Sequence, residues 1–325
     1  MAQYKIRRKT MKLSSKTLKR LFKGALHFKE ERGYLTAFRY EKSQLDYMED
    51  KSFDWGWRMR AKFTGCMRIE FKTNARSISF DYLASEIHER ANTIDLCVNG
   101  TLVKVHKIGE SKKGRVELSL DEGDKRVAIY MPCECELAIK NFTIDGNYSS
   151  VREKGKKLLI LGDSITQGAG VSMVSYAYPN VLQRETGYNV IAQGIGGYRF
   201  EPKDLTTLDS FEPDKILVFL GTNYYDCYDY DYESATKEYF KRIKELYPNT
   251  PIYEVTPLWR NNDVDWDRFN WCIDTVKKAC YENGITVIDG FDLVPNVDEC
   301  FADGVHPNSI GAYLLGTRIA NVIKK

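Results

Sequence analysis

The feature that most limits what this chain can fold into is a short apolar run at its middle, residues 158–161, which stops at a glycine. Its length and composition are typical of a buried β-strand. Small and polar residues continue from Gly162 to Gly170, and they predict a tight turn. In an open α/β sheet, a turn of this kind lies at the carboxyl edge, where such folds place their chemistry. The side chain that it would present is Ser164.

Strands and helices alternate over the rest of the C-terminal half. The predicted buried strands are residues 158–161, 190–191, 215–220, 252–256 and 285–288. The predicted helices are about residues 175–186, 234–246, 265–282 and 308–323. Buried strands separated by helices predict a parallel, doubly wound sheet, and right-handed crossovers would place helices on both of its faces.

The first half of the chain has a different pattern, in which apolar and polar residues alternate over short stretches. These stretches are residues 34–40, 67–72, 77–82, 94–98, 101–105, 116–120, 127–131 and 137–144. Asn99-Gly100 separates two of them and favours a type I′ hairpin turn. Many short strands with little helical periodicity predict a β-sandwich of the jelly-roll type.

At 325 residues the chain is long for one domain. We predict a basic N-terminal segment over residues 1–20, a β-sandwich domain over 21–148 and a catalytic α/β domain over 149–325. Residues 1–24 contain lysines and arginines but no acidic residue. This stretch is either an arm for an anionic partner or a solvated tail or strand edge.

Composition narrows the class of protein further. A hydrophobic content of 43% and a charged content of 29% are typical of a globular protein, and a net charge of +3 predicts neither nucleic acid nor membrane as a partner. The N-terminus lacks the apolar core of a signal peptide, and no apolar run has the length of a membrane span. We therefore expect a cytoplasmic protein.

The eight cysteines lack paired C-x-x-C spacing, which favours free thiols over disulfides or zinc ligands.

A serine nucleophile needs a base, a group that orients the base, and donors for the oxyanion. Of the four histidines, only His306 lies in the α/β half, and Asp303 precedes it by three residues. That spacing in a turn lets the carboxylate bind one imidazole nitrogen and leaves the other free for Ser164. The predicted catalytic residues are therefore Ser164, His306 and Asp303.

Two further strand ends carry candidate oxyanion donors. Gly194 follows the second predicted strand, and Asn223 follows the third. The backbone N–H of Ser164 would be another donor. A phosphate-binding loop is the alternative for a glycine-rich turn after a first strand, but the sequence has neither Gly-Lys-Ser/Thr there nor G-x-G-x-x-G.

Four motifs resemble, in order, the four sequence blocks of the GDSL or SGNH hydrolases. They are Gly162-Asp-Ser164, Gly194 with Gly197, Gly221-Thr-Asn223 and Asp303-x-x-His306-Pro307. The resemblance covers about the last 170 residues. It implies a flavodoxin-like three-layer fold and ester hydrolysis through an acyl-enzyme. It also implies that Ser164 is nucleophile and oxyanion donor, Gly194 and Asn223 are the other donors, His306 is the base and Asp303 orients it. Tyr224 departs from the family pattern, which usually has Asp at that place in the third block.

A jelly-roll-like domain ahead of such a hydrolase resembles the family 2 carbohydrate esterases, which remove acetyl groups from sugars. Trp259, Tyr198 and Tyr224 follow predicted strands and are candidates for stacking on a sugar, although they could equally pack the loops together. We therefore expect a serine esterase acting on short acyl esters of carbohydrates, acetyl esters above all.

The expected partner is a small-molecule or oligosaccharide ester, without nucleic acid, membrane, metal or cofactor. Two alternatives remain open from the sequence. One is a thioesterase or lipid esterase of the same fold, and the other is a non-catalytic carbohydrate-binding protein.

Overall fold

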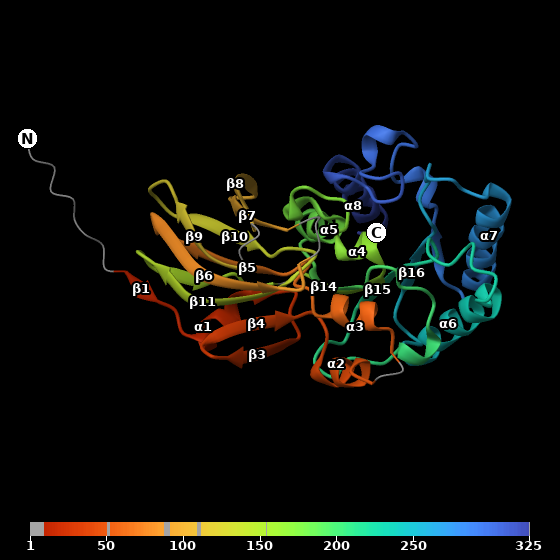
Figure 1. The fold of residues 1–325 in the computed structure, drawn as a ribbon, viewed down its shortest axis with the longest axis horizontal. Helices are drawn as coiled ribbons and strands as arrows, with labels where there is room; N and C mark the ends of the chain where they lie inside the picture. Colours follow the sequence, from red (N-terminus) through yellow and green to blue (C-terminus); the bar gives the residue numbers. More distant parts are fainter. Residues whose placement is uncertain (1–9, 51–52, 88–91, 109–111, 154, 325) are drawn as a thin grey trace, which may run out of the picture.

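The described residues form three β-sheets, two of them antiparallel and one parallel (Figure 1). The computed structural model describes residues 10–50, 53–87, 92–108, 112–153 and 155–324. Both antiparallel sheets lie in the first half of the chain, which we call the N-terminal region (residues 10–150). The parallel sheet and its helices form the C-terminal region (residues 155–324).

The two antiparallel sheets share one apolar core. The first sheet consists of β3 (His27–Glu31), β4 (Tyr34–Phe38), β11 (Glu136–Ile144), β6 (Ser77–Ser85) and β9 (Lys113–Ser119), with β1 (Met11–Lys12) on β11. The second consists of β12 (Tyr148–Ser150), β5 (Arg68–Thr73), β10 (Lys125–Tyr130), β7 (Thr93–Val98) and β8 (Thr101–Lys107), with β2 (Phe22–Lys23) on β5. Phe80 and Phe142 of the first sheet stack at 5.4 Å between ring centroids, and Phe71 of the second contacts Phe142 edge-on.

The strands predicted in this half are observed, including the hairpin. Asn99 and Gly100 both have positive φ, 51° and 87°, as a type I′ turn requires. The alternation of apolar and polar residues located these strands because one face of each sheet lies against the core.

The described part of this half also contains three helices of seven residues each, which the sequence analysis did not predict: α1 (Ser15–Leu21), α2 (Lys42–Met48) and α3 (Trp55–Ala61). Two turns are too short to show a clear helical period. Their local signals are the N-caps Ser14 and Asp54 and the capping box of Glu41 with Gln44. β1, α1 and β2 also place residues 11–23 within the N-terminal region, whereas residues 1–9 of the predicted basic segment lie outside the described residues.

The C-terminal region contains the predicted parallel, doubly wound sheet. Its strand order is β14 (Asn189–Gly194), β13 (Lys157–Gly162), β15 (Lys215–Phe219), β16 (Ile252–Val255) and β17 (Thr286–Ile288). Each neighbouring pair is parallel. This 2-1-3-4-5 order is that of flavodoxin-like sheets, in which sites form at the carboxyl edge beside the first strand.

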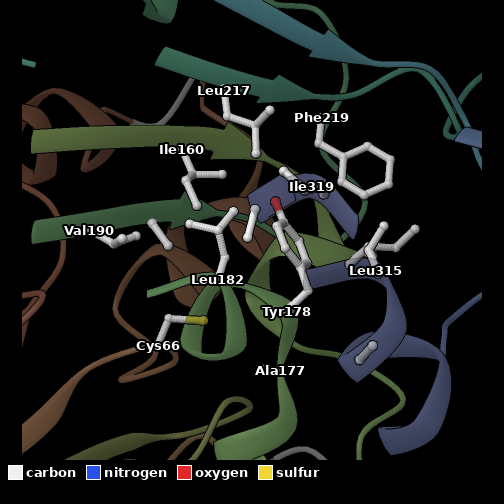
Figure 2. Packing of buried hydrophobic residues seen from close by; sticks show 14 of the residues in the cluster. Cys66, Ile160, Ala177, Tyr178, Leu182, Val190, Leu217, Phe219, Leu315 and Ile319 are labelled. Atoms are coloured by element: carbon white, nitrogen blue, oxygen red, sulfur yellow. The ribbon is translucent and has the colours of Figure 1, made fainter. Parts of the chain in front are cut away.

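Helices cover both faces of this sheet. Ile160 of β13 packs with side chains of α5 (Tyr178–Thr186) and α8 (Ser309–Ile323), as Figure 2 shows. Leu158 of the same strand belongs to the same cluster. Leu159 points to the other face, with α6 (Tyr232–Leu246) and α7 (Trp266–Glu282). Short helices complete the region: α4 (Ser164–Gln167), η1 (Val174–Tyr176), η2 (Pro202–Asp204), η3 (Gly290–Asp292) and η4 (Asp298–Cys300).

The two regions are joined by buried polar and apolar contacts. Asp95 of β7 is fully buried and accepts hydrogen bonds from the backbone N–H and the hydroxyl of Ser175, at 2.8 and 2.7 Å. Tyr130 and Cys133 of the N-terminal region belong to the same cluster as the β13 side chains.

None of the helices in the described parts of the chain is long and apolar enough to cross a membrane. All eight cysteines fall within the described residues and are free thiols.

The cluster of Figure 2 predicts a large loss of stability for Leu315→Ala. Leu315 is fully buried between α8 and the sheet, so truncation leaves a cavity that lowers the free energy of unfolding by about 2–5 kcal/mol. The control is Val322→Ala on the same helix, where 36% of the residue is exposed and the expected change is within about 0.5 kcal/mol. Urea unfolding followed by circular dichroism measures both, and equal losses would contradict the assignment of this core.

Candidate active site

Ser164 lies where β13 passes into the four-residue helix α4, as the apolar run and the following turn predicted. Asp163 caps this helix, and its Oδ1 accepts a hydrogen bond from the Ile165 N–H at 2.9 Å. Gly168 ends the helix with φ +100°, a left-handed conformation that glycine adopts without strain. The turn holds Ser164 with 8% of its surface exposed.

The structure brings the three predicted catalytic residues together. His306 Nε2 lies 2.8 Å from Ser164 Oγ, and His306 Nδ1 lies 2.9 Å from Asp303 Oδ2. An ionised carboxylate only accepts hydrogen bonds, so His306 carries its proton on Nδ1. Nε2 then has its lone pair directed at the serine hydroxyl, which is the arrangement that a general base needs.

Asp303 is held in its ionised form. Partial burial favours the neutral acid, but the hydrogen bonds from the His306 ring and from the backbone N–H groups of His306 and Val305 outweigh it and lower the pKa of Asp303. The loop itself is fixed by the bridge between Phe301 and Pro307. In addition, the Asn261 N–H donates to the carbonyl of Gly304 at 2.9 Å.

Asn223 lies beside the Ser164 turn, as predicted from its position after β15. Its Nδ2 donates to the Tyr198 carbonyl at 2.9 Å and to Asp163 Oδ2 at 3.2 Å. Asp163 is a residue of this site that the sequence analysis did not single out. Only 1% of it is exposed, and burial raises its pKa to about 7, partly offset by the Ile165 N–H and by the charges of His306 and Arg260. Its sequence signal is an N-cap residue type directly before the candidate nucleophile.

The geometry does not support the predicted role of the Gly194 N–H as an oxyanion donor. The Gly194 carbonyl accepts a hydrogen bond from Arg39 at 2.6 Å, whereas the next N–H, of Ile195, donates back to Gly162 in β13 at 3.0 Å. In a strand, the N–H and C=O of one residue point to the same side, so the Gly194 N–H faces Arg39. Gly194 instead permits close packing, since a Cβ there would lie 2.4 Å from the backbone nitrogen of Gln167.

The turn that follows Gly194 offers a different donor. The Tyr198 N–H donates to the Ile195 carbonyl at 3.0 Å, and Gly197 has φ +76°, as the third position of a type II turn requires. Among the described residues, no acceptor receives the Gly197 N–H. This turn also lies next to Asn223, through the bond to Tyr198.

The three aromatic candidates do not lie together. Tyr198 and Tyr224 both contact Trp57 of α3, with ring centroids 4.9 and 6.4 Å away. The Arg199 guanidinium lies 4.5 Å from the centre of the Tyr224 ring and pairs with Glu201. Trp259 packs separately against Phe301, at 5.5 Å, beside the loop that carries Asp303 and His306. Trp57 itself was missed by the sequence analysis because it lies in a short helix of the other region.

Within the described residues, no group of three or more His, Cys, Asp or Glu side chains is placed to hold a metal ion. The site as described therefore consists of the hydrogen-bonded Ser164, His306 and Asp303, the capping carboxyl of Asp163, and Asn223 next to the 195–198 turn.

Asp163 predicts a specific dependence of stability on pH. Its pKa is raised from 3.8 to about 7 on folding, so folded Asp163 keeps a proton that the unfolded chain has lost. Its contribution to stability is full below about pH 4 and is lost as the pH rises to about 7, by a few kcal/mol at most. Asp163→Asn keeps the helix cap and removes this titration.

We therefore expect the thermal midpoint of the unmodified protein to fall more between pH 5 and pH 8 than that of Asp163→Asn. Asp121→Asn, at an exposed position, is the control and should follow the unmodified protein. Parallel pH profiles for all three proteins, measured by differential scanning calorimetry, would show that Asp163 does not titrate in this range.

Comparison with known proteins gives a family for the C-terminal region. Residues 160–314 match the model of the GDSL-like lipase/acylhydrolase family. Over 214 residues the chain is 28% identical to an acetylxylan esterase from Xylanibacter ruminicola, a match that covers 53% of this chain. The match covers only 44% of that relative, so the chain spans less than half the length of this curated protein.

Solved structures share the fold of the whole chain. A putative GDSL-like lipase from Bacteroides ovatus has a TM-score of 0.77 at 18% identity, over 97% of both chains. The salicylyl-acyltransferase SsfX3 of a tetracycline biosynthetic pathway has 0.73 at 18%, over 97% of this chain and 96% of its own. A family two carbohydrate esterase from Cellvibrio japonicus has 0.64 at 14%, over 97% and 98%. The predicted resemblance to these esterases is thus confirmed for the fold. The family model thus identifies residues 160–314 of this chain as a GDSL-like lipase/acylhydrolase domain.

Proposed function

We propose that this protein is a carboxylic ester hydrolase that removes short acyl groups, acetyl above all, from carbohydrates through an acyl-enzyme. The observation that carries the proposal is the unbroken hydrogen-bond chain from Ser164 Oγ through the His306 ring to Asp303. A hydroxyl, an imidazole and an ionised carboxylate in this order are the groups that acyl transfer to serine requires.

In the first step, Ser164 Oγ attacks the ester carbonyl while His306 Nε2 takes its proton. The positive charge on the ring is then stabilised by Asp303, whose own pKa is held low. The proton next passes from Nε2 to the leaving alcohol, and the acyl group stays on Ser164. In the second step, His306 takes a proton from water, which attacks the acyl-enzyme and releases the acid.

The negative charge that develops on the carbonyl oxygen needs preorganised donors. We propose the N–H of Ser164, the N–H of Gly197 in place of Gly194, and the amide of Asn223. Both hydrogens of the Asn223 amide are engaged, with Tyr198 and Asp163. The longer bond, to Asp163 at 3.2 Å, is the one that Asn223 would share with the oxyanion.

The carbohydrate substrate is supported by the names of the relatives, an acetylxylan esterase in sequence and a family two carbohydrate esterase in fold. Half-buried aromatic rings near the site, Tyr198 and Tyr224 on one loop system and Trp259 on another, fit contacts with sugar rings. We also propose that the two N-terminal sheets form a β-sandwich of the jelly-roll type.

Replacing the nucleophile tests the mechanism. We expect Ser164→Ala to lower kcat for p-nitrophenyl acetate by at least about 10⁴-fold, because the acyl-enzyme no longer forms. Ser119→Ala, at an exposed position at the end of β9, is the matched control and should retain full activity. Hydrolysis by Ser164→Ala at the rate of the unmodified protein would sink the serine mechanism.

Acyl chain length tests the substrate class. We expect kcat/KM for acetylated xylo-oligosaccharides to exceed that for p-nitrophenyl palmitate and for palmitoyl-CoA by at least about tenfold. An enzyme discriminates between substrates by how strongly it binds their transition states, so a site that fits a short acyl group on a sugar should disfavour a long acyl chain. Release of acetate, fatty acid or CoA measures the three rates on one enzyme preparation. A preference for palmitate esters would favour a lipid esterase, and a preference for palmitoyl-CoA would favour a thioesterase.

A further inference from the structure

Three side chains of the N-terminal region bind carbonyls at the end of β14 and in the turn that follows it. We call this segment (residues 194–198) the oxyanion turn. Arg39 Nη2 donates to the Gly194 carbonyl at 2.6 Å, and Arg60 Nη1 donates to the Gly196 carbonyl at 3.3 Å. Trp57 Nε1 donates to the Gly197 carbonyl at 3.1 Å. A turn of the catalytic region is thus held from outside that region, by residues on or next to α3.

Arg39 makes the most buried of these contacts, with 1% of the residue exposed. Its guanidinium also donates to the carbonyls of Arg60, at 2.9 Å, and Gly65, at 3.5 Å. Its own carbonyl accepts a bond from Gln193 Nε2 at 3.1 Å. Burying a cation among carbonyl oxygens is costly unless its donors are well placed, so this contact links α3 to the end of β14 at a defined distance.

The catalytic region holds the same turn from its other side. Gln167 of α4 accepts a bond from the Gly196 N–H at 2.9 Å, and Asn223 donates to the Tyr198 carbonyl at 2.9 Å. Of the N–H groups of residues 195–198, only that of Gly197 is left without an acceptor among the described residues. Because a trans peptide holds its C=O and N–H in opposite directions, the bond from Arg60 to the Gly196 carbonyl sets the direction of the Gly197 N–H, away from Arg60.

We propose that Trp57, Arg60 and Arg39 are positioning residues, through which the N-terminal region holds the oxyanion turn so that its free N–H stabilises the transition state. The inference rests on the proposed ester hydrolysis. An oxyanion donor acts only within a narrow range of distances, so a small shift of this turn lowers the rate of the chemical step without preventing substrate binding.

Trp57→Phe tests this with little change in packing, because it removes the indole N–H and keeps a ring against Tyr198. We expect kcat for p-nitrophenyl acetate to fall about 5- to 30-fold while KM changes less than twofold, which is the pattern for a contribution made in the transition state. Trp55→Phe, on the same helix but 66% exposed, is the matched control and should keep the kcat of the unmodified enzyme.

A second pair of variants separates hydrogen bonding from general damage. Arg60→Lys retains a donor for the Gly196 carbonyl, whereas Arg60→Met does not. We expect Arg60→Met to lower kcat and Arg60→Lys to restore most of it.

Inhibition by phenylboronic acid provides an independent readout, since the serine adduct is a tetrahedral anion that resembles the transition state. Its inhibition constant should rise by the same factor by which kcat/KM falls.

Loss of folded enzyme alone would lower the apparent kcat but leave the phenylboronic acid inhibition constant unchanged, and that result would overturn the inference. Equal kcat values for Trp57→Phe and Trp55→Phe would overturn it as well. Failure of the underlying esterase proposal looks different, because Ser164→Ala would then hydrolyse the ester as fast as the unmodified protein.

Discussion

The hydrogen bond between Ser164 Oγ and His306 Nε2 is the contact on which the rest of the site depends, and it joins residues 142 positions apart in the chain. Each partner comes from a loop with little freedom: one from the capped turn after β13, the other from the loop between Phe301 and Pro307. The parallel sheet explains why these loops meet. All of its strands end at the same edge, so loops that are distant in sequence converge there.

Two carboxyl groups near this bond have opposite pKa shifts for reasons that the structure makes plain. Asp163 is fully buried and receives few donors, so its pKa rises to about 7. Asp303 is partly exposed and receives the imidazole and two backbone N–H groups, so its pKa falls. Below about pH 7, the buried cap of the Ser164 turn is therefore a neutral acid, and it adds no second negative charge next to His306.

Much of the site could be predicted from the sequence, because the decisive signals were local. A serine in a tight turn after an apolar run and a histidine three residues after an aspartate each have a defined meaning at a sheet edge. The geometry does not support the prediction for Gly194, because the direction of a backbone N–H depends on which side of a strand is paired, and residue type does not reveal this. Trp57 and Arg39 were missed because their contacts with the Gly194 and Gly197 carbonyls arise from packing between two regions, and α3 is too short to show a helical period.

The packing between the two regions has a consequence for how the protein folds and evolves. Side chains of the N-terminal region, such as Tyr130 and Cys133, belong to one apolar cluster with the strands beneath Ser164. A shared core couples the free energies of both halves, so they should melt in a single cooperative transition rather than as independent modules. The N-terminal region therefore cannot be exchanged or lost like an appended module, because removing it would expose the apolar core beneath Ser164 to water.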